Sequence, residues 1–105
     1  MRGLILVTRR YEKMKEHRDA SGRLSIDLDP NSHNFKKFAS RLESEVNAKE
    51  INRLDGLDER YWDYDVEGTT IVLHSNVSVG VSIHVEDGSR DELLRSVAER
   101  IGKEQ

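Results

Sequence analysis

The stretch "DERYWDYDVEGTTIVLH", Asp58–His74, contains two runs of alternating apolar and polar residues around a Glu67-Gly68 pair. Alternation with a period of two is typical of a half-buried β-strand. Glu67-Gly68 suits a two-residue hairpin turn, because glycine readily adopts a positive φ. The stretch therefore predicts two antiparallel strands, about 60–66 and 69–74.

This turn also predicts which side chains face each other across the hairpin. On the face that helices would cover, the expected pairs are Val66 with Thr69, Tyr64 with Ile71 and Trp62 with Leu73. On the other face they are Asp65 with Thr70, Asp63 with Val72 and Tyr61 with His74. We expect Trp62 and Tyr64 to be core residues, since each combines a large apolar ring with one polar atom.

The next segment, 78–85, alternates valine and isoleucine with small or polar residues and predicts a third strand. Its apolar side chains must share a face with Ile71 and Leu73, because a slip of one residue turns a strand over. A three-residue connection, 75–77, satisfies this condition and places Leu73 opposite Val79. The other face would then carry the rows Tyr61–His74–Ser78, Asp63–Val72–Gly80 and Asp65–Thr70–Ser82.

Two other segments, about 31–47 and 90–102, place apolar residues at helical spacing. Further strands are expected at Leu4–Arg10, 23–29 and 50–54, and the polar segment 11–23 predicts a hairpin arm or a frayed helical turn. Met14 is an alternative start of translation, which would remove the strand at Leu4–Arg10. The predicted order is β-β-α-β-β-β-β-α.

Short connections between the later strands exclude parallel crossovers, so the sheet should be mostly antiparallel. Two helices with one apolar stripe each can cover one face of it. We therefore expect an α+β fold, a two-layer sandwich of five to six strands with both helices on one face. It forms a single domain over residues 1–105, with 1–23 as a loosely attached strand and arm.

Composition excludes several functional classes. The 105-residue chain has 17 basic and 20 acidic residues, a net charge of −3, and so lacks the basic footprint of a nucleic-acid-binding protein. No cysteine is present, which fits a reducing cytoplasm. The apolar run "GLILV" is too short for a signal peptide or a membrane span. We expect a cytoplasmic protein without a bound cofactor, because no glycine-rich phosphate loop occurs either.

The uncovered face of the sheet is the candidate binding surface. Its predicted residues are Tyr61, Asp63, Asp65, Thr70, His74, Ser78, Ser82 and His84, flanked by Asp58 and Glu59. A tyrosine commonly anchors a protein interface, and carboxylates steer basic partners. The pattern therefore favours a non-catalytic module that binds another protein, with homodimerisation through an edge strand as the alternative.

Catalytic and metal-binding readings of the same residues are weaker. Asp63, His74 and Ser78 would form a hydrolase row only if a base contacted the nucleophile in a site with an oxyanion hole. No nucleophile elbow is present, and an open sheet face forms no pocket. The spacing of Asp63, Asp65 and His74 matches neither an EF-hand loop nor the His-Glu-x-x-His pattern of metal ligands. We expect neither a catalytic residue nor a metal site.

The segment Leu57–Asp87 resembles a motif in small bacterial proteins of unknown function, some of which are similar to immunity proteins of polymorphic toxin systems. The matching residues are Tyr61-Trp62-Asp63, Gly68, Leu73-His74 and Gly80 with the alternating apolar residues after it. The resemblance covers about thirty residues. It implies a toxin-neutralising binder without catalytic activity of its own.

Overall fold

A computed structural model of the chain describes residues 14–102. Its strands are β1 Glu16–Arg18, β2 Leu24–Asp29, β3 Lys49–Asp55, β4 Glu59–Val66, β5 Thr69–Asn76 and β6 Gly80–Val85. Its helices are α2 Phe35–Glu45 and α3 Asp91–Ile101, which follow the short 3-10 turns η1 Ser32–Asn34 and η2 Gly88–Arg90. Within this part of the chain, neither helix has the length and apolar character needed to cross a membrane.

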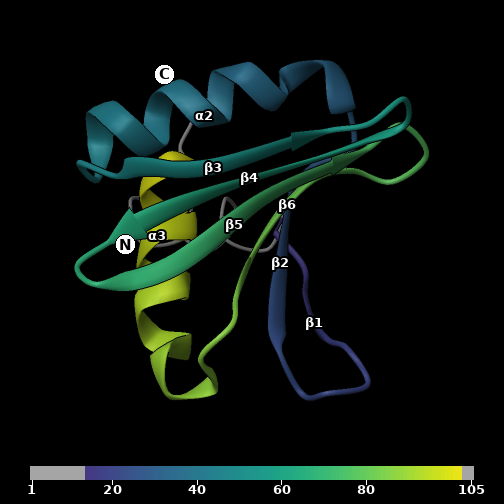
Figure 1. The fold of residues 1–105 in the computed structure, drawn as a ribbon. Helices are drawn as coiled ribbons and strands as arrows, with labels where there is room; N and C mark the ends of the chain where they lie inside the picture. The colour runs from purple at the N-terminus through teal and green to yellow at the C-terminus, as the bar shows by residue number, and fades with distance from the viewer. Residues whose placement is uncertain (1–13, 103–105) are drawn as a thin grey trace, which may run out of the picture.

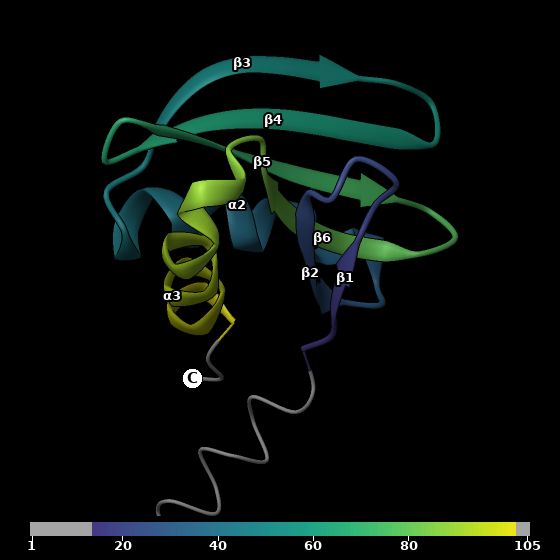
Figure 2. The same cartoon turned by 90° about the horizontal axis from the view of Figure 1, so that it is seen from below.

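The strands form one antiparallel sheet in the order β1-β2-β6-β5-β4-β3. Both helices lie on the inner side of the curved sheet (Figures 1 and 2), where α2 packs against β5 and α3, and α3 packs against β6 and β2. The predicted α+β fold, its element order and its two layers are confirmed. The strand expected at Leu4–Arg10 lies outside the described residues, whereas the polar arm after it contains β1 and forms a hairpin with β2.

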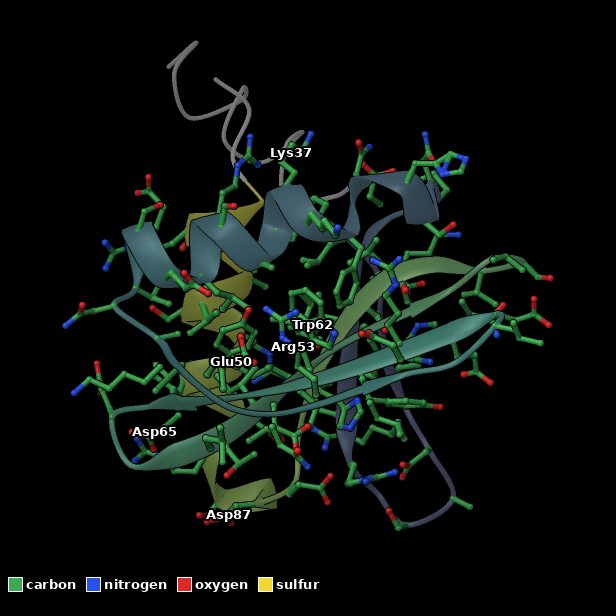
Figure 3. All side chains as sticks on the ribbon, turned by 45° about the horizontal axis from the view of Figure 1, so that its top comes forward. Lys37, Glu50, Arg53, Trp62, Asp65 and Asp87 are labelled. Carbon is green, nitrogen blue, oxygen red and sulfur yellow. The ribbon has the colours of Figure 1, made fainter. Side chains whose placement is uncertain are left out.

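The core is built from the apolar alternation of the strands and the apolar stripes of the two helices. Trp62 and Tyr64 are 5% and 0% exposed, so their expected place in the core is confirmed. The Trp62 indole Nε1 donates to Asp55 at 2.7 Å, and its ring meets Phe35 edge to face at 4.8 Å. Figure 3 shows Trp62 and Arg53 side by side between α2 and the sheet, where the guanidinium lies 3.7 Å from the ring centroid. Burial raises the pKa of Tyr64 to about 12.

The register predicted for the β4–β5 hairpin is confirmed at every pair. Trp62 lies opposite Leu73, and Tyr61 lies opposite His74. Glu67 and Gly68 form the two-residue turn with φ values of 53° and 82°. Two consecutive left-handed residues match the right-handed twist of the adjoining strands, so this turn fixes the pairing by itself.

The register predicted for the β5–β6 hairpin is wrong by four residues. Leu73 pairs with Ile83 rather than Val79, and the loop consists of residues 77–79 rather than 75–77. A shift of four keeps the side chains of β6 on their expected faces, so the apolar alternation cannot distinguish the two registers. It does move Val79, expected in the core, into the loop, where it is 63% exposed. The actual register is supported from outside the hairpin, because β6 also pairs with β2.

Candidate functional site

The sheet surface opposite the helices, called the open face here, carries most of the predicted site. The residues on it are Tyr61, Asp63 and Asp65 from β4, Thr70 and His74 from β5, and Ser82 and His84 from β6. Ser78 is not among them, because it lies in the β5–β6 loop. The corrected register places Ser82 opposite His74 and His84 opposite Val72. The predicted rows that end in Ser78, Gly80 and Ser82 are therefore wrong.

The open face extends further than the sequence predicted. Strand β2 pairs with β6, which adds Ser25 beside His84 and Asp27 beside Ser82. Strand β1 then adds His17, whose Nε2 lies 2.9 Å from an Asp27 carboxylate oxygen. The alternation in "RLSIDLD" indicates that Ser25 and Asp27 share a polar face. It does not indicate which strand lies next to them, so these residues were not assigned to the site.

One cluster, Glu59 with Tyr61 and His74, is held rigidly on the open face. The Tyr61 and His74 rings stack at 4.2 Å between centroids with an interplanar angle of 9°. The Tyr61 hydroxyl donates to Glu59 Oε1 at 2.8 Å, and His74 Nε2 lies 2.7 Å from the same oxygen. The bond to His74, and to a smaller extent the bond to Tyr61, lowers the pKa of the Glu59 carboxyl. The bond to Glu59 in turn raises the pKa of the Tyr61 hydroxyl.

Two carboxylates beside this cluster have no partner among residues 14–102. Asp63 and Asp65 make no hydrogen bond or ion pair with any residue in the range 14–102. Asp63 lies opposite Val72, which is 5% exposed although it belongs to the open face. Figure 3 shows Asp65 at the end of the sheet away from α2. β4 therefore presents unpaired negative charge next to a covered apolar residue.

His84 is the most enclosed histidine of the open face. Its side chain is 15% exposed and lies between Val72 of β5 and Ser25 of β2. Its Nε2 is 3.7 Å from Glu86. Burial, with a smaller contribution from the charge of Arg23, lowers the pKa of His84. The β6 register places His84 opposite Val72, where the predicted register placed Gly80.

The geometry offers little for hydrolysis or metal binding. The base and nucleophile of the predicted hydrolase row, His74 and Ser78, are not cross-strand neighbours, and His74 is bonded to Glu59. Ser82, which does lie opposite His74, makes no hydrogen bond to it. No group of three or more potential metal ligands occurs within residues 14–102.

One edge strand of the sheet is β3, whose residues are all exposed. Leu54, 64% exposed, lies beside Tyr61 on the open face, and Ile51 is 57% exposed. The strand bulges between Glu50 and Asn52. Bulges and charged side chains are features that protect natural edge strands from pairing with another chain.

Comparison with known proteins does not identify a family. The chain matches no protein-family model, no curated protein and no solved structure.

Proposed function

We propose that this chain is a non-catalytic domain that binds a basic partner protein through its open face. The observation that carries the proposal is the rigid Tyr61 cluster next to the unpaired carboxylates Asp63 and Asp65. An aromatic side chain that is already ordered loses little conformational entropy on binding. Such a side chain is well suited to anchor an interface.

The surroundings of Tyr61 support the same role. Exposed Leu54 adds apolar area beside the ring. All three ionisable residues that β4 places on the open face besides Tyr61 are acidic: Glu59, Asp63 and Asp65. An apolar centre with an acidic surround complements a partner with lysine and arginine around an apolar pocket. A toxin that cleaves nucleic acid has this chemistry, in line with the resemblance to immunity proteins.

Site-specific photo-crosslinking in the native cells would test this proposal. A photoreactive phenylalanine derivative at Thr70, on the open face, is expected to give a discrete adduct with a basic protein. The same group at Ser96, an exposed position on α3, is the matched control and should give none. Adducts of equal strength from both positions would contradict the proposal.

Charge reversal provides the quantitative part of the test. Asp63→Arg together with Asp65→Arg should weaken binding of the captured partner more than tenfold, because like charges facing each other in an interface cost several kcal/mol, roughly. Glu99→Arg, an exposed position on α3, should leave the affinity unchanged. If the Thr70 adduct joins two copies of this chain, the open face is a homodimer interface and the proposal is wrong.

A further inference from the structure

A cavity of about 350 Å³ lies on the helix-covered side of the sheet, away from the open face. It forms where the β3–β4 and β5–β6 turns meet the start of α2, at one end of the molecule (Figure 1). The Val77 amide donates to the Asp58 carbonyl at 3.1 Å and ties the two turns together. The volume of the cavity lies at the lower end of the range for small-molecule sites, about 300–1,000 Å³.

Two hydrogen-bond donors in this cavity lack an acceptor. Ser75 and Arg60 face each other across β5 and β4 on the helix-covered side, and both line the cavity. Ser75 is 5% exposed, and its hydroxyl has no hydrogen-bond partner within residues 14–102. The Arg60 guanidinium has only a 4.0 Å contact with Asp55 and likewise makes no hydrogen bond. The Ser75 hydroxyl and the half-exposed Arg60 guanidinium can therefore both donate to an acceptor that enters the cavity.

Both cations and carboxylates line the cavity. Lys36, in the first turn of α2, adds a second cation to Arg60. Two acidic residues, Asp58 and Glu59, line the cavity as well. The charges of the lining are therefore balanced, two cations against two carboxylates, and the Glu59 carboxylate is held on the open face by Tyr61 and His74.

Part of the remaining wall is apolar, and Ser32, His33 and Gly56 line the rest. Phe35, 1% exposed, lies under the Arg60 guanidinium at 5.6 Å from the ring centroid. At the rim, Leu57 is fully exposed at 102% and Val77 is 60% exposed. A planar guanidinium with a neighbouring hydroxyl matches the two oxygens of a carboxylate. We propose that the cavity binds a small organic carboxylate with a short apolar tail, whose oxygens meet Arg60 and Ser75 and whose tail lies against Phe35 and Leu57.

Titration of the full chain with 3-phenylpropionate, followed by amide chemical shifts in NMR, would test this site. Saturable shifts are expected at Ser75, Arg60 and Phe35, and not at Tyr61 or Asp63 on the open face. The neutral isostere 3-phenylpropionamide should bind at least tenfold more weakly, because it brings no negative charge to Arg60. Inorganic phosphate should also bind at least tenfold more weakly, because it lacks the tail. Equal binding of phosphate or of the amide would overturn the proposal.

Variants locate the site within the molecule. Arg60→Gln should weaken 3-phenylpropionate binding at least tenfold, and Ser75→Ala should weaken it by a smaller factor. Lys36→Gln and Lys37→Gln form a matched pair: both lysines are exposed on α2, but only Lys36 lines the cavity, and Lys37 lies on the outer side of the helix (Figure 3). Only Lys36→Gln should reduce the affinity. Equal effects of the two lysine variants, or no saturable shift at Ser75 in the unmodified chain, would show that the cavity is not a carboxylate site. Asp63→Arg should change nothing here, so this test is independent of the open face.

Discussion

The β4–β5 and β5–β6 hairpins are neighbours in one sheet, but different contacts determine their geometry. The first closes on Glu67 and Gly68, and no atom lies within 4 Å of where a Cβ of Gly68 would be. The second closes on the loop 77–79, and β6 begins at Gly80, which lies against the backbone of Asp29 and Pro30. One hairpin is therefore determined locally, whereas the other is also held by the end of β2.

Gly80→Ala should have the largest effect on stability. An added Cβ would overlap the Asp29 carbonyl oxygen and lie 2.7 Å from Pro30 Cα, and Gly80 has a φ of 113°. Overpacking and an unfavourable φ together should lower the free energy of unfolding by about 2–5 kcal/mol. Urea denaturation followed by far-UV circular dichroism measures this change. Gly88→Ala, where no atom lies within 4 Å, is the control and should be nearly neutral. Equal midpoints for the two variants would mean that β6 is not fixed against β2.

Gly68→Ala should cost less, although its φ of 82° is also left-handed. Nothing crowds the new methyl group, so only the conformational penalty remains, about 1–2 kcal/mol. The same denaturation experiment compares it directly with Gly80→Ala. A loss at Gly68 as large as that at Gly80 would show that the local turn, rather than the contact with β2, dominates both hairpins.

The same difference explains how far the sequence predicts this fold. Alternation around Glu67-Gly68 predicts every pair of the β4–β5 hairpin, because the turn and the apolar pattern allow one register. Alternation after Asn76 does not distinguish Val79 from Ile83 as the partner of Leu73, because the two residues are an even number of positions apart. The choice depends on Asp29 and Pro30, about fifty positions earlier in the chain.

In the candidate sites, too, the sequence predicts what a local hairpin determines and not what depends on contacts between distant segments. Tyr61 and His74 were predicted as neighbours because one local hairpin places them together. The rigidity of this pair could not be predicted, since it depends on Glu59 reaching both side chains. The cavity was not predicted either. It joins Ser75 and Arg60 of the sheet to Lys36 of α2, and no periodic pattern in the sequence relates these elements.

The smallest expected effect is a dependence of stability on pH that comes from His84. In the actual register His84 lies between Val72 and Ser25, and its burial lowers the pKa of the imidazole from 6.5. Above this pH the side chain is neutral in both the folded and the unfolded states. As the pH falls through 6.5, the unfolded chain takes up a proton that the folded chain does not, so the free energy of unfolding decreases.

Urea midpoints at pH 7.5 and 5.5 isolate this effect. Stability that comes from the lowered pKa of Glu59 is lost only as the pH falls below 4.5, outside the interval. Replacing His84 with glutamine should reduce the loss of stability between the two pH values, whereas His33→Gln, at an exposed position before α2, should leave it unchanged. An unchanged loss in the His84 variant would mean that this side chain is not enclosed by β2. If Gly80→Ala also left the free energy of unfolding unchanged, the two results would support the register in which Gly80, rather than His84, lies opposite Val72.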